Sequence, residues 1–321
     1  MTGRRAIGAV AVCVGLAACA PPAAEDVAAP PPARDRVAEA APPAARPRSD
    51  YSLALGQYYR RLQNDLMAQG LMREDGGGPD TPFTDEMLAR NFVRIALFDE
   101  YAEDGVSLVQ EMRPSRLRRW EAPVRYHVET GATITAAEAA RDRAAVSAYV
   151  ARLARATRHD IAMAGSAGAA NFHVLFLDED ERLAASDRLR ELVPGIAESS
   201  VRAIRNLPRS TLCVVVAFSE PGSHAITRAV AIIRSEHPDA LRLACIHEEL
   251  AQGLGLANDH PQVRPSIFND DEEFALLTRH DELLLRILYD PRLRPGMAAA
   301  EAAPVVRQIA RELMPGDGPG V

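Results

Sequence analysis

The sequence predicts an α+β fold, in which a mixed sheet packs against helices and a small helical portion precedes the sheet. Apolar residues recur at helical spacing in the stretches 51–72, 84–98 and 135–157. Short segments rich in β-branched and aromatic residues predict strands at 120–128, 171–177, 212–218 and 226–233. A further helix begins near Asp239, directly after the last of these strands. Such a series of strands and helices is typical of an α+β protein.

The predicted strands differ in their expected place in the sheet. Pro123 lies inside 120–128, and proline is confined to edges and strand starts because it lacks an N–H. The continuous apolar run of 212–218 predicts a buried strand, whereas 226–233 is the segment expected to form an edge strand. The acidic run 178–181 lacks the glycine and the spaced ligands of a calcium loop, so a solvated turn is expected there.

The N-terminus resembles that of a bacterial lipoprotein. Two arginines precede the apolar run 6–18, which is too short to span a bilayer, and the run ends in Leu-Ala-Ala-Cys at Cys19, similar to a lipobox. The resemblance implies that residues 1–18 are a signal peptide and that Cys19 is acylated, which would anchor the protein in the membrane. By the same resemblance, Ala20 after the cysteine, in place of aspartate, implies the outer membrane, facing the periplasm. The alternative is an ordinary secretory signal with a chance cysteine.

Composition divides the rest of the chain. Residues 19–49 are almost wholly alanine, proline and scattered charge, which predicts an extended tether. A helical N-terminal portion is expected over 50–106, the sheet-containing domain over 107–297, and a C-terminal helix and tail over 298–321. The formal net charge of −7 argues against nucleic acid as a partner, because neutralising phosphates requires a basic surface.

Two cysteines remain beyond the predicted lipid anchor. In an oxidising envelope Cys213 and Cys245 are expected to form a disulfide that joins a strand to the helix after Asp239. Two buried free thiols are the alternative, because cysteine is often simply a core residue.

The stretch 245–259, C-I-H-E-E-L-A-Q-G-L-G-L-A-N-D, is the most informative part of the chain. It resembles the zinc-binding helix of metzincin proteases, H-E-x-x-H-x-x-G-x-x-H, without its three histidines. In that family the histidines hold zinc and the glutamate acts on the metal-bound water. When Gly255 is placed on the motif glycine, Glu249 falls on this general base. The three former metal-ligand positions are then Glu248, Gln252 and Asn258.

These ligand positions carry the wrong donors for zinc. Glu248 and Gln252 share a helix face because they are four residues apart, and Asn258 returns after the Gly255 turn. Zinc prefers imidazole and thiolate over one carboxylate and two amide oxygens. With Asp259 and Asn269 they could hold a hard cation weakly, although calcium takes six to eight oxygens. No cofactor is therefore expected, and the three side chains are expected to form a satisfied polar network.

Two later segments extend the resemblance. Residues 265–268, P-S-I-F, are similar to the S-I-M of the metzincin Met-turn, with Phe268 where the methionine lies. Residues 277–289 are similar to the C-terminal helix of matrixin-type enzymes. Three such features in order imply a zincin-like (metzincin-type) mixed sheet with an active-site helix. The turn and floor of its site would be formed by Gly255, Asp259, Ser266 and Phe268.

The stretch 120–297 also resembles an uncharacterised proteobacterial lipoprotein family, domain of unknown function 2927. Its marks are E-E-x-x-Q-x-L-G-L-x-N-D at 248–259, S-I-F-N-D at 266–270 and L-Y-D-P-R at 288–292. The resemblance implies that the absent histidines are a family trait, and it supplies no activity.

The two histidines that flank the motif do not complete it. Four residues after His247 stands Ala251, so the helical histidine pair is missing, and His260 lies two residues beyond the third ligand position. Each is expected to be exposed or to cap a local turn.

The sequence thus leaves three functions open. The first is a non-catalytic, zincin-like envelope lipoprotein that binds an extended peptide or envelope protein along 226–233, because zincin edge strands pair with substrate by adding a strand. The second is a metallopeptidase-like hydrolase with a Glu/Gln/Asn site, in which Glu249 is the base. The third is a structural lipoprotein whose cleft is idle.

Overall fold

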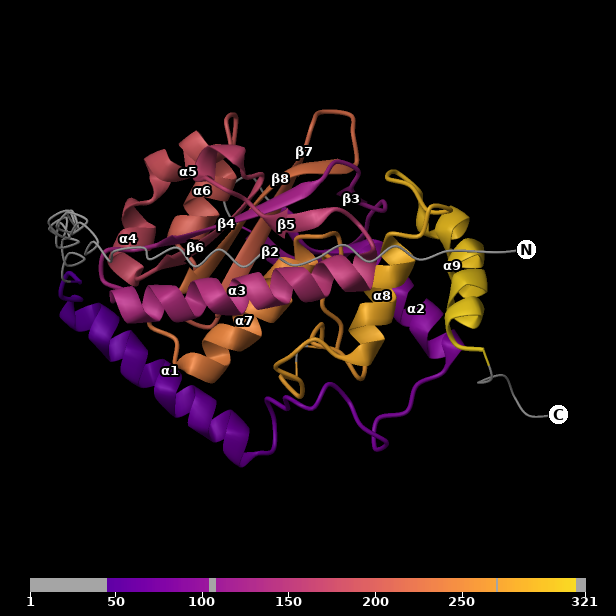
Figure 1. Cartoon of the computed structure of the whole chain (residues 1–321), viewed down its shortest axis with the longest axis horizontal. Coiled ribbons are helices and arrows are strands. Elements are labelled where there is room, and N and C mark those ends of the chain that lie inside the picture. Colours follow the sequence, from indigo (N-terminus) through magenta and orange to yellow (C-terminus); the bar gives the residue numbers. More distant parts are fainter. Residues whose placement is uncertain (1–44, 104–107, 270, 316–321) are drawn as a thin grey trace, which may run out of the picture. The chain divides into compact units, whose positions relative to one another are not determined.

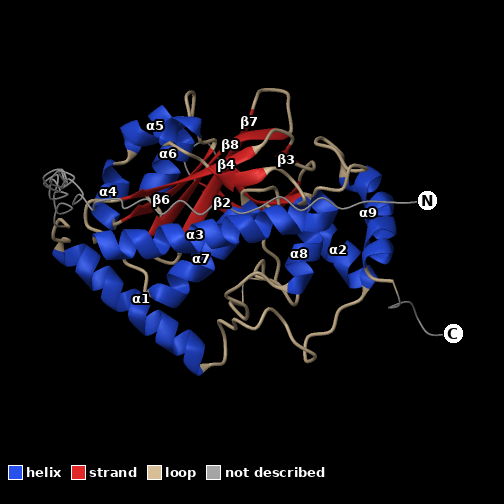
Figure 2. Ribbon diagram, in the orientation of Figure 1, coloured by secondary structure: helices blue, strands red, loops and turns tan. Residues whose placement is uncertain are grey.

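A mixed sheet forms the centre of the fold (Figure 2). The computed structural model describes residues 45–103, 108–269 and 271–315. The main strands lie in the order β5-β4-β6-β8-β7, and the short β3 pairs with the start of β8. Their bounds are Arg119–Trp120 (β3), Val124–Thr130 (β4), Ile161–Met163 (β5), Phe172–Leu177 (β6), Cys213–Ser219 (β7) and Ala225–Arg234 (β8). Every pairing within this sheet is parallel except that of β7 with β8, so the predicted α+β class with a mixed sheet is confirmed.

β7 is one edge strand of the sheet, with β5 at the other edge, and the prediction that 226–233 lies at an edge is wrong. β8, which contains that stretch, is hydrogen-bonded to β7 on one side and to β6 on the other. The apolar run of β7 misled the prediction, because an edge strand covered by helices is as apolar as a central one. Pro123 divides the predicted strand 120–128 into β3 and β4, as its missing N–H requires.

Helices cover both faces of the sheet (Figure 1). On one face α3 and α7 pack on Tyr126, Phe172 and Ala231, and on the other α5 and α6 pack on Leu175 and Ile232. A further layer is made by α2, α8 and α9, which contact one another. The bounds are Asp85–Ala96 (α2), Ala136–Thr157 (α3), Glu179–Ala184 (α4), Ser186–Leu192 (α5), Glu198–Arg205 (α6), Asp239–Gln252 (α7), Arg279–Leu288 (α8) and Ala299–Leu313 (α9). A separate hairpin is formed by β1 (Phe98–Glu103) and β2 (Leu108–Pro114).

The first helix, α1 (Asp50–Ala68), packs on the N-terminal end of α7. Its Gln63 side-chain oxygen accepts the backbone N–H groups of Ala240 and Leu241, each at 3.2 Å. These are donors of the first turn of α7, which have no partner within their own helix. Ser52 donates to the buried Glu236 carboxylate at 2.8 Å. Contacts from α1 therefore help to position the helix that carries the motif.

The acidic run 178–181 is not a solvated turn, so that prediction is wrong. Asp178 forms a capping box with Glu181 at the start of α4. The Glu179 carboxylate accepts from Arg182 at 2.6 Å and from Arg234 at 2.7 Å, and both guanidinium groups are almost completely buried. Buried guanidinium groups require a counter-charge, which this carboxylate supplies.

The predicted disulfide between Cys213 and Cys245 is confirmed. It joins the first residue of β7 to the middle of α7 across a sequence separation of 32 residues. The edge strand and the motif helix are therefore held together covalently.

Replacing both cysteines by alanine is expected to lower the free energy of unfolding by about 3–4 kcal/mol, because a loop of this length loses its constraint in the unfolded chain. Urea unfolding followed by circular dichroism measures this difference. Dithiothreitol should lower the midpoint of the wild type and leave the double variant unchanged. If complete reduction left the unfolding midpoint of the wild type unchanged, the expectation would be contradicted.

None of the helices in the described part of the chain combines the length and the apolar run needed to cross a membrane. The predicted signal peptide, Cys19 and the tether up to residue 44 lie outside the described residues, as does Asp270 of the S-I-F-N-D stretch.

Candidate functional site

The motif helix α7 is held at its C-terminal end by aromatic side chains. Tyr149 donates its hydroxyl to the carbonyl of His247 at 2.7 Å, and Tyr126 donates to that of Leu250 at 3.2 Å. Trp120 and Tyr289 likewise donate to the next carbonyls, those of Gly253 and Leu254. The Leu250 carbonyl lies in the last turn of α7, and those of Gly253 and Leu254 follow the helix, so they lack partners within it and these donors stabilise the end of α7. Sequence reasoning missed this set of donors, which come from four separate parts of the chain.

Gly255 makes the chain reversal that the metzincin resemblance implied. Its φ of +122° lies in a region that side chains rarely adopt, and a Cβ there would stand 2.1 Å from the Arg118 carbonyl oxygen. Glycine is therefore required both by conformation and by space. After this turn the chain brings Asn258 and Asp259 back toward the end of α7.

Two of the three former ligand positions make hydrogen bonds to separate partners. The Gln252 amide donates to Asp259 Oδ1 at 2.9 Å. The Asn258 amide donates to the Arg94 carbonyl of α2 at 2.9 Å, and its backbone N–H donates to the Ile95 carbonyl. Both side chains are buried, so these bonds satisfy donors that water does not reach. Asn258 thereby joins the loop after α7 to α2.

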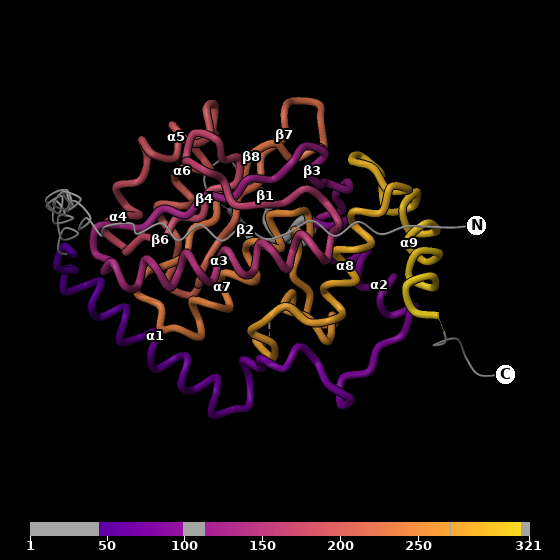
Figure 3. The backbone as a smooth tube through the Cα atoms, in the orientation of Figure 1, coloured from indigo at the N-terminus to yellow at the C-terminus, as the bar shows by residue number. Residues whose placement is uncertain are grey.

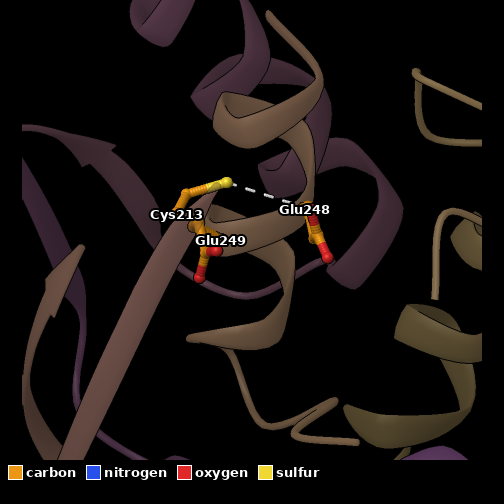
Figure 4. A group of neighbouring side chains, drawn as sticks. All are labelled: Cys213, Glu248 and Glu249. Atoms are coloured by element: carbon orange, nitrogen blue, oxygen red, sulfur yellow. Dashed lines mark hydrogen bonds between the residues drawn. The ribbon is translucent and has the colours of Figure 1, made fainter. Parts of the chain in front are cut away.

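The third position, Glu248, lies beside the disulfide. Figure 4 shows Cys213 of β7 next to Glu248 and Glu249 of α7, with the Cys213 sulfur 4.0 Å from a Glu248 oxygen. One sulfur and one oxygen of each carboxylate lie within 4.8 Å of one another. Because Cys213 is bonded to Cys245, its sulfur has neither a proton to donate nor a negative charge. The 4.0 Å approach is therefore a packing contact.

These residues do not fit zinc. A structural or catalytic zinc site needs imidazole, thiolate or carboxylate donors in tetrahedral array. Within the described residues the one compact group of potential ligands is Cys213, Glu248 and Glu249, and its sulfur is held in the disulfide. The Gln252 and Asn258 amides are each oriented by another acceptor.

The floor of the site is a turn tied to α8. Ser266 donates its hydroxyl to Asp281 Oδ1 at 2.5 Å, and the Ile267 N–H donates to Asp281 Oδ2 at 3.1 Å. Phe268 donates its N–H to the Ser266 hydroxyl and is completely buried. Asp281 also accepts the N–H of Thr278, as part of the capping box of α8. Sequence reasoning missed Asp281, although Thr278-x-x-Asp281 followed by apolar residues is a capping-box pattern.

His247 is buried, so the expectation that it is exposed or capping is wrong. Its Nδ1 accepts the N–H of Leu277 at 3.0 Å, and its ring stacks on Tyr149 with centroids 3.9 Å apart. Burial, with a smaller contribution from the Arg152 charge, lowers the pKa of this histidine to about 3. His247 is therefore a neutral structural residue. His260 is half-buried, and its Nδ1 accepts the N–H of Gln262 within its own loop.

We expect acid to destabilise the protein through His247. Its pKa is about 3 in the folded protein and 6.5 for an unperturbed histidine of the unfolded chain, so its contribution is complete above pH 6.5 and is lost as the pH falls toward 3. At pH 5 the loss amounts to about 2 kcal/mol relative to pH 7.5. Asparagine at this position retains a polar acceptor but does not titrate. The melting temperature of His247→Asn should therefore fall less between pH 7.5 and 5 than that of the wild type, and equal falls would contradict the assignment.

The fold and the site together define an α+β protein with a mixed sheet, in which a disulfide-linked helix and edge strand adjoin a buried polar turn. The chain belongs to the family described as Protein of unknown function (DUF2927), which matches residues 85–308. The match is wider than the predicted 120–297, because it begins with α2 and extends into α9. No curated protein and no solved structure matched the chain.

Proposed function

We propose that this protein is a lipid-anchored, zincin-like protein of the cell envelope that binds an extended polypeptide without cleaving it. The bound segment would add a strand to β7, since a strand at a sheet edge offers backbone groups for pairing. The proposal rests on the position of β7 at an edge of the sheet. In the described part of the chain it has a strand partner only on the side of β8, and the disulfide holds it against the motif helix.

The order of elements supports the zincin-like part of the proposal. The chain forms β4, α3, β5 and β6, then the edge strand, β8 and the motif helix, followed by the Gly255 turn and the Ser266–Phe268 floor. The side chains at the former ligand positions, Glu248, Gln252 and Asn258, support the absence of catalysis, because they do not fit zinc. Without a Lewis acid the pKa of water stays high, and Glu249 has little to activate.

Hydrogen exchange tests the binding mode. Peptides would be selected from a random library on the full chain, and exchange of β7 backbone amides would be compared with and without peptide. Strand addition should protect about every second β7 amide, because only alternate N–H groups of a strand point to its open edge. Protection confined to other elements would contradict the proposal.

Metal content tests the non-catalytic part. The full chain, purified without chelator, is expected to contain no stoichiometric metal. The Gln252→Ala variant is expected to contain none either. Metal bound by the wild type and lost in the variant, with peptide hydrolysis that Glu249→Ala abolishes, would instead establish the metallopeptidase-like alternative.

The lipid anchor is tested separately. Intact mass of the membrane-extracted protein should show an acylated chain beginning at Cys19, and Cys19→Ser should move the protein to the soluble envelope fraction. An unmodified cysteine would refute the anchor and leave the binding proposal standing.

A further inference from the structure

Four arginines that lie outside the motif 245–259 line a cavity. The cavity has a volume of about 400 Å³ and is lined by residues from the C-terminal end of α3, from α8 and from the end of α9. Figure 3 shows the end of α3 beside α8. We call it the arginine pocket. Its lining consists of Arg152, Arg155, Arg158 and Arg286, one acidic residue, Glu282, and the apolar residues Ala156, Leu283 and Leu313.

Two of the arginines are held in place by the backbone. Arg286 donates to the carbonyls of Ala156 and Arg155, at 2.6 and 2.7 Å, and so caps the C-terminal end of α3. Arg152 donates to the Leu277 carbonyl at 2.8 Å and pairs with Glu282 at 2.7 Å. Both guanidinium groups are therefore oriented before any ligand arrives.

The other two arginines, Arg155 and Arg158, have exposed side chains that are available to a ligand. The side chains of Arg155 and Arg158 are exposed and make no hydrogen bond or ion pair within residues 45–315 as described. Arg158 ends α3 in the left-handed conformation, with φ of +59°. Three arginines at spacing of three residues, 152, 155 and 158, thus share the same end of α3 in a chain whose net charge is −7. The one carboxylate in the lining is already paired with Arg152.

We propose that the arginine pocket binds a phosphate monoester. Guanidinium groups match phosphate oxygens through paired N–H donors, and several of them in a concave site with a single acid create a local positive potential. The cavity exceeds the needs of a bare ion and has the size of small-ligand sites. Leu283 and Leu313 provide an apolar wall for a group attached to the phosphate. The ligand is either a soluble phosphate ester or a lipid headgroup.

Calorimetric titration tests this site. The full chain carrying Cys19→Ala, so that no acyl chain competes, would be titrated at low ionic strength with inorganic phosphate and with dihexanoyl phosphatidic acid below its micelle concentration. Saturable one-site binding is expected for both. Arg155→Ala/Arg158→Ala should weaken it at least tenfold, whereas Arg155→Lys/Arg158→Lys should weaken it less, because charge remains and the planar fork is lost.

The matched control is Arg60→Ala/Arg61→Ala, which makes the same change in charge at two exposed positions of α1. It should leave binding unchanged. Phosphatidic acid that binds at least tenfold more tightly than phosphate would identify a lipid headgroup, and equal binding would identify a soluble phosphate group. Absence of saturable binding, or equal weakening by the α1 control, would overturn the proposal. Unchanged melting temperatures exclude a folding defect as the cause of any loss.

Discussion

Gly255→Ala is expected to destabilise the protein by about 3 kcal/mol or more, because two costs add at this position. A φ of +122° is strained for any residue with a Cβ, and the new methyl group would stand 2.1 Å from the Arg118 carbonyl oxygen. That oxygen belongs to the backbone next to β3, so it cannot move without displacing the strand. Thermal and urea unfolding of the full chain measure the loss.

Gly70→Ala is the matched control for this effect. Gly70 follows α1 with φ of +78°, and a Cβ there has no atom within 4 Å. It isolates the conformational cost, which is expected to be about 1 kcal/mol. If the two variants lost the same stability, the close approach of Arg118 to Gly255 would not be the reason for glycine at the motif turn.

The sequence predicted the Gly255 turn and the disulfide because both follow from short patterns. The resemblance of 245–259 to the metzincin motif implied a chain reversal at its glycine, and two cysteines in an oxidising compartment indicate a disulfide. Thr135, Asp178 and Thr278 each begin a capping box, a pattern that can be found in the residues alone. Such features depend on neighbours a few positions apart.

The errors concern residues whose partners lie far away in the chain. Glu179 looked solvated because its buried partner Arg234 is 55 positions later, although its other partner, Arg182, is only three positions away. His247 looked exposed because nothing in its helix indicates the Leu277 N–H that its ring accepts. The edge position of β7 likewise depends on which strand pairs with β8, a choice that hydrophobic pattern alone does not make.

The positions of the candidate residues relative to α7 could be predicted from the sequence, but their hydrogen bonds could not. Alignment of the motif correctly placed Gln252 before the Gly255 turn, at the end of α7, and Asn258 after it. Asn258, however, donates to a carbonyl of α2, an element that precedes it by more than a hundred residues. The hydrogen bonds of Gln252 and Asn258 are therefore made to Asp259 and to α2, and not to each other as the expected network required.

Asp281→Ala is expected to have an effect as large as that of Gly255→Ala, about 3 kcal/mol or more. The carboxylate is fully buried and accepts from Ser266, Ile267 and Thr278, so its removal leaves several donors without partners. The loss should be concentrated in the turn at the site floor. Hydrogen exchange of residues 264–269 should therefore rise at least as much as that of α8.

Graded variants separate this bonding from a general loss of packing. Ser266→Ala removes one hydrogen bond and should cost about 1 kcal/mol, and Asp281→Asn should lie between the two because it keeps the shape and one acceptor oxygen. Asp187→Ala, at a fully exposed aspartate, should change stability by no more than about 0.5 kcal/mol. If Asp281→Asn proved as stable as the wild type, the buried carboxylate would not be what holds Ser266 and Phe268 beneath the motif helix. A loss graded as expected would make Asp281 the residue on which the shape of the site floor depends.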